Sequence, residues 1–544
     1  MGISLKDIFK NDEERLIENR RKTSIRNLII FICVLVVVIT ITAIIRFWGD
    51  VDENRREAIT KDITNIRTAV LSIGEQVEID STLEYSGTNL EEEGAQLTIN
   101  GITMEYRYGY YLITPEDLKE LPVEPNLNNE TYIVNYITGD VINVAGIKYK
   151  GRMYHSFEDL DAIAKGQPII SDNTTVISSA SDLEKMRQNA NGYYKLTANI
   201  DMKDYLTSKE GWDPVQTFSG VFDGRGYTIS NLTINNTSQD YVGMFGNVKS
   251  SAKIGNLKLD NVNITGGEFT GALAGNCSGI ISNVHVLSGN VTGFRDSTGG
   301  IAGSFSIGSI ENCTAKVNVD GDKNVGGIVG TLYNGYISRV KFEGNVTATD
   351  NVGGFIGLAR ISDATQISEC ATNIAVNGKN NLGGFVGAIE MTASKNLEIK
   401  NSYAIGSIQA GETNIGGMFG QIYTIQGTPS FILTYLYSKV SVVPKGETCG
   451  GSIGYCSVAG SSQNYTNSFW EKNIAPGTVL NDVGTATEGS TIAFIAKTPE
   501  EMKMFRTYTD WDFRSVWEIE ERMSTPTLRW EKNYLNTEVN TDEK

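Results

Sequence analysis

Apolar and polar residues alternate in short runs over much of the chain. Examples are IGNLKLDNVNI (254–264), ISNVHVLSGNV (281–291), ISRVKFEGNV (337–346) and IKNSYAIGSI (399–408). Alternation with a period of two predicts β-strands, because successive side chains of a strand point to opposite faces. The region is therefore predicted to be mainly β.

A glycine motif recurs beside these strands, in the form Gly-Gly-apolar-apolar-Gly. Eight copies occur: GMFG (243–246), GALAG (271–275), GGIAG (299–303), GGIVG (326–330), GGFIG (353–357), GGFVG (383–387), GGMFG (416–420) and GGSIG (450–454). Their final glycines are 27 to 34 residues apart. Two or three short strands in each such period make one coil of a solenoid that stacks on its neighbours. We predict a right-handed parallel β-solenoid (β-helix) of about 8–9 coils, with the glycines at corners that need positive φ.

The N-terminal part has a different pattern. Residues 27–48 read NLIIFICVLVVVITITAIIRFW, and a run of about 20 apolar residues is long enough to span a bilayer. A cleaved signal peptide is the alternative, but its apolar region is shorter and ends in a small-residue site. Arg20, Arg21, Lys22 and Arg26 precede the run, which favours a cytoplasmic N-terminus. The sequence thus predicts a single-pass protein of the cell membrane, with a cytoplasmic tail at 1–26 and the rest at the cell surface.

Residues 49–80 contain a second helix candidate. Its apolar residues recur every three or four positions and would form one stripe: Ile59, Ile63, Ile66, Val70, Ile73 and Val77. We expect the stripe to pack on the next domain. A short coiled-coil stalk is the alternative, although the run is shorter than three heptads.

Residues 81–168 are predicted to form a small α+β domain. Tyr132, Val134 and Tyr136 recur at every second position, and the turn residues Thr138-Gly139-Asp140 follow, which indicates a hairpin. A membrane helix, an amphipathic helix and a small sheet in this order resemble the type IV pilin or pseudopilin plan. The resemblance departs from that family because Arg26 precedes the apolar run and no Glu lies inside it.

The glycine motif resembles the GLUG repeat of bacterial surface proteins, which also accompanies some immunoglobulin-A-cleaving peptidases. GYYKLTANIDM (192–202) at the entry and PTLRW (526–530) at the exit support the resemblance. It implies a β-helical surface module without catalytic residues, over 172–462, followed by a C-terminal cap at 463–535 and a tail at 536–544.

Composition narrows the function classes. The net charge of −17 argues against a nucleic-acid partner, because phosphate binding needs basic surface. The chain has two histidines, His155 and His285, and no HExxH sequence, which argues against a histidine-based metalloprotease or a Ser-His-Asp hydrolase. We predict no cofactor and no metal.

The cysteines follow the repeat. Cys313 and Cys370 share a mostly apolar position two coils apart, too far for a disulfide. We predict free, buried thiols at Cys277, Cys313, Cys370, Cys449 and Cys456, with Cys33 in the apolar run at 27–48. An extracellular disulfide framework is the alternative.

A few residues are candidates for chemistry or binding. Asp223, Asp320 and Asp322 could be catalytic carboxylates, but Asp-Gly pairs are more typical of turns. Four asparagines share one position of the repeat and could form an amide ladder, which Arg339 and Glu369 interrupt: Asn256, Asn283, Asn312 and Asn401. Six tyrosines could contact a ligand: Tyr194, Tyr333, Tyr336, Tyr423, Tyr435 and Tyr437. Extra loops near 388–397 and 421–430 are further candidates.

The sequence therefore favours a surface protein that binds or adheres to a glycan, a matrix protein or a neighbouring cell without catalysis. One alternative is a pilin-like structural subunit or minor component of a pilus or secretion-like assembly. The other is a carbohydrate-active β-helix enzyme, which would need a cluster of carboxylates in a groove.

Overall fold

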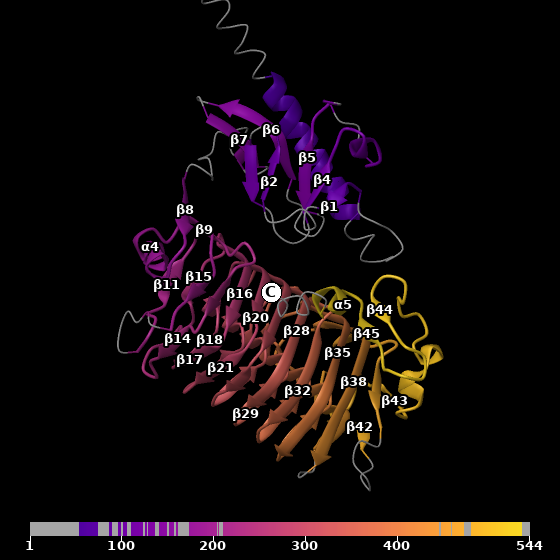
Figure 1. The fold of residues 1–544 in the computed structure, drawn as a ribbon. Coiled ribbons are helices and arrows are strands. Elements are labelled where there is room, and N and C mark those ends of the chain that lie inside the picture. The colour runs from indigo at the N-terminus through magenta and orange to yellow at the C-terminus, as the bar shows by residue number, and fades with distance from the viewer. Residues whose placement is uncertain are drawn as a thin grey trace, which may run out of the picture. The chain divides into compact units, whose positions relative to one another are not determined.

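The computed structural model describes residues 54–73, segments of 86–160, and 173–535 except 204, 206–209, 445–447, 459 and 473–479. The chain divides into two compact units, Met1–Ile73 with Ser86–Ile169, and Gly74–Tyr85 with Ile170–Lys544 (Figure 1). Each unit is described by itself below.

The first unit combines one helix with an antiparallel sheet. The helix covers 54–73, and the sheet has the order β1-β4-β5-β6-β7. Its strands are β1 Thr88–Asn89, β4 Tyr110–Ile113, β5 Tyr132–Asn135, β6 Val141–Tyr149 and β7 Arg152–Ser156, with a separate hairpin of β2 Gln96–Ile99 and β3 Ile102–Glu105. The pairing Ile133↔Ile142 of β5 and β6 confirms the predicted hairpin.

The apolar stripe of this helix is buried within the unit. Ile59, Ile63, Ile66 and Val70 are fully buried. Asp62 on the same helix is also buried, and its carboxylate accepts hydrogen bonds from the backbone N–H groups of Asn126 and Leu127 at 2.6 and 3.0 Å. The predicted packing of the stripe, rather than a coiled coil, is therefore confirmed for these four residues; Ile73 is half-buried, and Val77 lies outside the described residues.

The predicted membrane location is corrected. In the described part of the chain, no helix has both the length and the apolar character needed to cross a bilayer. This finding overturns the single-pass location with a cytoplasmic N-terminus that we predicted. The apolar run at 27–48 on which the prediction depended lies outside the described residues, as does Cys33.

The second unit is a parallel β-solenoid (Figure 1). Ten strands, one from each coil, follow one another along one side: β11 Val215–Phe218, β15 Phe245–Val248, β19 Ala274–Cys277, β23 Ala302–Phe305, β27 Val329–Leu332, β30 Ile356–Ile361, β34 Val386–Met391, β37 Phe419–Thr424, β39 Cys449–Ser457 and β42 Asn481–Ala486. The solenoid has more coils than the 8–9 predicted, because β11 and β42 belong to coils that lack the glycine motif.

The other sides of the coils form a 20-stranded sheet. Its longer strands are β16 Lys253–Asp260, β20 Ile280–Val286, β24 Ser309–Lys316, β28 Gly335–Thr347, β32 Ala371–Asn377, β35 Asn396–Gly411 and β38 Ser430–Pro444. Shorter strands complete the coils: β10 Ile200–Asp201, β14 Thr233–Asn235, β17 Val262–Gly266, β21 Gly289–Gly293, β25 Asn318–Asp320 and β41 Phe469–Glu471. Each coil thus pairs with the coils before and after it.

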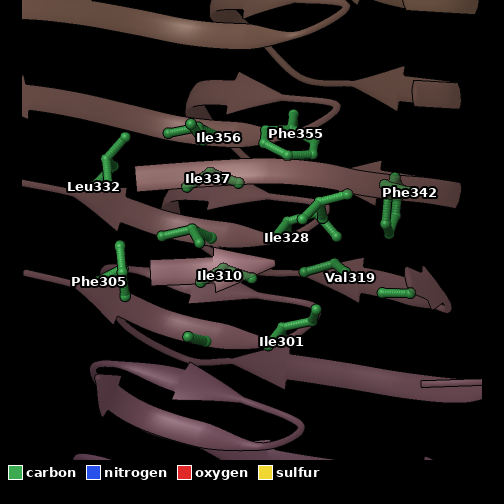
Figure 2. Close-up of a cluster of buried hydrophobic side chains, with 14 of the residues drawn as sticks. Ile301, Phe305, Ile310, Val319, Ile328, Leu332, Ile337, Phe342, Phe355 and Ile356 are labelled. Atoms are coloured by element: carbon green, nitrogen blue, oxygen red, sulfur yellow. The ribbon is translucent and has the colours of Figure 1, made fainter. Parts of the chain in front are cut away.

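The core consists of apolar side chains that stack in register inside the coils. Ile310 lies opposite Ile337, and Phe305 opposite Leu332, all fully or almost fully buried (Figure 2). Phe355 and Phe385 stack with their ring centroids 4.7 Å apart and their planes at 4°. The alternating pattern of the sequence is therefore the pattern of inward and outward side chains.

The glycines of the motif have a different role from the one predicted. Gly326, Gly327 and Gly330 do not have positive φ. A Cβ added at Gly326 would collide with the backbone oxygen of Val329, and one at Gly327 with the backbone oxygen of Gly354 in the next coil. These positions need glycine because backbones approach closely, whereas asparagine makes up 11 of the 20 non-glycine residues with positive φ in the described part of the chain.

A C-terminal segment, residues 498–535, folds back over one outward face of the solenoid. It contains β44 Trp517–Glu518, β45 Thr527–Leu528 and α5 Trp530–Leu535. Trp511, Trp517 and Trp530 donate to the backbone oxygen of Asn467, the Asn401 side chain and the backbone oxygen of Glu369, at 2.9, 3.3 and 3.0 Å. The segment therefore covers several coils along the side of the stack (Figure 1).

Candidate binding groove

A groove of about 640 Å³ lies on the first four coils of the solenoid. Its lining is almost entirely polar: Asp201, Lys203, Asn231, Thr233, Asn261, Val262, Asn263 and Asn290. These residues come from β10, β14, β17, β21 and the corners between strands, so one or two polar side chains enter the groove from each coil.

One wall of the groove is a chain of hydrogen bonds along the solenoid axis. The side-chain amide of Asn261 donates to that of Asn231 at 2.6 Å, and Asn231 donates to the carboxylate of Asp201 at 2.7 Å. Both asparagines have positive φ, 60° and 52°, a conformation that asparagine tolerates well. The hydrogen bond from Asn231 and that from the backbone of Lys203 lower the pKa of Asp201, so the chain ends on an ionised carboxylate.

The other wall belongs to a straight row of outward-facing side chains. The strand register places Thr233 opposite Asn263, and Asn263 opposite Asn290. The row continues beyond the groove to Asn318 and Asn345. We call Asn263, Asn290, Asn318 and Asn345 the asparagine row; all four are exposed.

The amides of this row also bond to one another. Asn318 donates to Asn290 at 3.0 Å, and Asn345 donates to Asn318 at 2.9 Å. An amide has two N–H donors and an oxygen with two lone pairs. Each amide–amide bond within the row uses one N–H donor of one side chain and one oxygen lone pair of the next. The exposed side of every amide can therefore still hydrogen-bond to a ligand. The arrangement suits a molecule rich in hydroxyl groups, which also both donate and accept.

The predicted carboxylates are not brought together. Asp223 accepts hydrogen bonds from the backbone N–H of Arg225 at 2.9 Å and from Asn256 at 3.0 Å, and Arg225 has positive φ. Asp223 therefore holds a turn, as the Asp-Gly sequence indicated. Asp320 and Asp322 are exposed, Asp320 at the end of β25 and Asp322 just after it.

The predicted asparagine position forms only a short ladder. Asn283 donates to Asn256 at 3.1 Å. The residues at this position share positive φ of 49° to 57°: Asn256, Asn283, Asn312, Arg339, Glu369, Asn401 and Tyr435. The position is thus a corner that asparagine favours and that other residues can occupy.

Sequence reasoning missed a longer asparagine ladder and the asparagine row. Asn351 donates to Asn324 at 2.7 Å, Asn381 to Asn351 at 2.8 Å, and Asn414 to Asn381 at 2.8 Å, all from positive-φ corners. The signal was available, because these asparagines, like those of the outward row, recur with the period of the glycine motif.

The six candidate tyrosines occupy different environments. Tyr194 and Tyr437 are buried, and each hydroxyl donates to a backbone oxygen, that of Asn189 or Pro526, at 2.6 Å. Tyr333, Tyr423 and Tyr435 are half-buried. Tyr336 is 56% exposed and is the tyrosine of the six most accessible to a ligand.

The late coils carry a charged cluster near the predicted extra loops. Arg360 pairs with the buried Glu390 at 2.6 Å, and the hydroxyl of Tyr423 also donates to Glu390. Burial and the hydrogen bond to Glu390 raise the pKa of Tyr423. The three residues of this cluster lie in β30, β34 and β37. Part of the extra length of the late repeats therefore extends strands instead of forming loops.

Several other titratable groups are buried in the solenoid, away from the groove. The five described cysteines are free and buried, as predicted, and burial raises the pKa of Cys277 and Cys313 to about 12. Burial also raises the pKa of Asp482 to about 6, where it accepts hydrogen bonds from Ser452 and the backbone of Phe494. Within the described ranges, no group of three or more His, Cys, Asp and Glu side chains could hold a metal ion.

Comparison with known proteins identifies a related region. Residues 163–288 match the family model of the M26 IgA1-specific metallo-endopeptidase N-terminal region. The match covers the entry of the solenoid and includes most of the groove.

Two curated proteins resemble the chain over 148 residues each. One is "Halomucin" of Haloquadratum walsbyi, at 34% identity. The other is "Putative Gly-rich membrane protein" of Evansella cellulosilytica, at 33% identity. Each alignment covers 25% of this chain, but only 2% of the first relative and 17% of the second.

One solved structure is similar over a larger part. It is described as a "putative immunoglobulin A1 protease" from Bacteroides ovatus, with 17% identity and a TM-score of 0.32. The alignment covers 67% of this chain and 93% of that chain. A likeness at this score and identity carries no conclusion.

Proposed function

We propose that this chain is a surface-displayed, non-catalytic binding protein whose solenoid presents the groove of Asn231, Asn261, Asn263 and Asn290 to a glycan. The observation that carries the proposal is this polar groove, lined by amides from successive coils. The similarity to halomucin and to a Gly-rich membrane protein supports a surface setting. Under this proposal the repeats are of the GLUG type.

The electrostatics favour an uncharged ligand. The chain has a net charge of −17, and Asp201 in the groove is ionised. A polyanionic glycan would be repelled by this field, whereas neutral hydroxyl groups can bond to amides and to the carboxylate.

The proposal excludes catalysis by the solenoid. Glycoside hydrolysis uses two carboxyl groups on either side of the scissile bond. Asp201 is the single carboxylate among the residues that line the groove. Asp223 accepts a hydrogen bond within its own turn, which also argues against a catalytic role. A carbohydrate-active enzyme is therefore the weaker alternative.

A pilin-like structural role is the second candidate. The observation that favours it is the first unit, in which an amphipathic helix buries its apolar stripe within a unit that also holds an antiparallel sheet. If this second candidate function holds, we expect the chain to associate with pilus-like machinery and to bind no specific glycan.

The test is binding of the full chain to an array of glycans and matrix proteins, with the mass of each recovered glycan measured. The variant Asn263→Ala/Asn290→Ala removes two amides from the groove, and we expect at least a tenfold loss of affinity. Gln216→Ala, an exposed amide on β11 in the other sheet of the solenoid, is the matched control. Retention of no glycan, equal binding by the groove variant, or a change in ligand mass would each contradict the proposal.

A further inference from the structure

The asparagine row lies beside a second row on the same face. Two residues further along each strand, the register aligns Thr265, Thr292, Asp320 and Thr347. We call these four the threonine row. Side chains two apart on a strand point to the same side, at a separation of about 6.6 Å. Three of the four are threonines and one is the exposed Asp320, so the whole face is polar.

These two rows make a regular lattice. Along the solenoid axis the repeat is the separation of paired strands, about 4.8 Å. The hydrogen bonds of 3.0 and 2.9 Å between Asn290, Asn318 and Asn345 fix the amides at that repeat. The groove shares Asn263 and Asn290 with the asparagine row, and the row continues from the groove without a change of register.

From this continuity we propose that the ligand is a neutral, extended polysaccharide that lies along the solenoid axis, with one sugar residue on each coil. The inference rests on the proposed function and adds the polymeric class and direction of the ligand. A ribbon-like chain of the cellulose or chitin type repeats at nearly the spacing of the coils and has hydroxyl groups on both edges. One edge would meet the asparagine row and the other the threonine row.

The lattice determines how affinity depends on chain length. An oligosaccharide of up to four sugars fills the groove and contacts Asn263 and Asn290. A hexamer reaches Asn318 and Asn345, and two further amide bonds strengthen binding by about tenfold over the tetramer. A ligand that binds in the groove alone would gain nothing beyond the tetramer.

The experiment is calorimetric titration of the full chain with cello-oligosaccharides and chito-oligosaccharides, from dimer to octamer. We expect affinity to rise up to the hexamer in the wild type. In Asn318→Ala/Asn345→Ala the gain beyond the tetramer is lost, while tetramer affinity is unchanged. Gln216→Ala keeps the full length dependence, and a thermal unfolding curve verifies that each variant is folded.

The outcomes separate this inference from the proposed function. Affinity independent of length, or a length dependence unaffected by Asn318→Ala/Asn345→Ala, overturns the polymer inference and leaves a groove ligand in place. If these oligosaccharides do not bind, but a different array ligand is lost in Asn263→Ala/Asn290→Ala, the inference also fails and the proposed function stands. If nothing on the array is retained, both fail.

Discussion

The solenoid has two outward faces of contrasting composition. One holds the asparagine and threonine rows, and all four asparagines of that row are exposed. The other holds a row that includes Lys341, Ala371, Tyr403, Tyr437 and Phe469, and the C-terminal segment covers this part of it. The coils are built alike on both sides, so the outward residues alone distinguish the two faces.

The covered face shows what happens when outward residues are aromatic. Tyr403 and Tyr437 stack with their ring centroids 4.9 Å apart, and Trp511 and Trp517 pack on them. The buried Glu531 accepts a hydrogen bond from Tyr403 at 2.9 Å and pairs with Lys341 at 2.9 Å. Leaving such a row in water would expose a large apolar patch, and the C-terminal segment removes it. The asparagine row needs no cover, because amides are well solvated.

The largest expected effect comes from removing an aromatic side chain that packs on the covered face. Trp517 is fully buried, and Trp517→Ala should destabilise the C-terminal segment by about 3–5 kcal/mol. We expect proteases to cleave within 498–535 while the coils remain intact, as seen by limited proteolysis with mass spectrometry. Trp517→Phe, which keeps most of the contact, is the control. If Trp517→Ala is as resistant as the wild type, the segment does not depend on this contact.

Alkaline pH should act on the same face. Burial raises the pKa of Tyr403, Tyr437 and Tyr508 well above 10, the value in the unfolded chain. Above pH 10 the folded state therefore holds more protons than the unfolded state, and stability falls as pH rises. The loss is about 1.4 kcal/mol for each of these tyrosines at pH 11.

Hydrogen exchange measured between pH 8 and pH 11 is the test. After correction for the intrinsic pH dependence of exchange, the opening of 498–535 should become easier above pH 10. Strands β17, β21 and β25 should be affected less. Uniform loss of protection in both regions would argue that the two faces are not separate in stability.

Asn351 at a corner and Asn318 on an outward face allow the contributions of corner and face asparagines to stability to be compared. Asn351 sits at a corner with φ of 52° and bonds to Asn324 and Asn381. Asn351→Ala loses both bonds and places alanine in a conformation it disfavours, which should cost about 2 kcal/mol in unfolding free energy. Asn351→Gly should recover part of the loss, because glycine accepts the same φ. Urea unfolding of the three proteins provides the measurement, and equal stability of Asn351→Ala and wild type would contradict the role given to the corner.

The smallest effect on stability is expected on the asparagine row. Asn318 is exposed and does not have positive φ, so Asn318→Ala should change the unfolding free energy by only about 0.5 kcal/mol. The same urea titration measures it beside Asn351→Ala. A cost as large as that of Asn351→Ala would mean that the row exists to hold the coils together, which would weaken its assignment to ligand binding.

Much of the fold could be predicted from local pattern. The period of GGIVG and its relatives defined the coils, and the alternation in ISRVKFEGNV defined which side chains point inward. The first and last coils escaped because VQTF at 215–218 and NDVGTA at 481–486 lack the glycine pair. The role of Gly326 was also missed. A close approach between two backbone segments depends on which segment lies opposite in the folded chain, and the local sequence does not specify that segment.

The groove was harder to foresee, for a physical reason. Asp201, Asn231 and Asn261 are far apart in sequence, and they meet because equivalent positions stack at each coil. A single asparagine in a strand has no special meaning; it becomes a candidate contact only when the register aligns it with others. The return of residues 498–535 over Tyr437 and Tyr403 likewise depends on long-range packing.

In-register stacking also makes the coil a unit of inheritance. Thr298 and Val325 occupy equivalent positions in consecutive coils, as do the neighbouring glycines. Removal of residues 298–324 would bring Val325 directly after Ser297, and every later residue would still meet an equivalent partner. A gene for such a chain can therefore gain or lose whole coils by recombination between repeats, which changes the length of the surface while the C-terminal segment keeps its own partners.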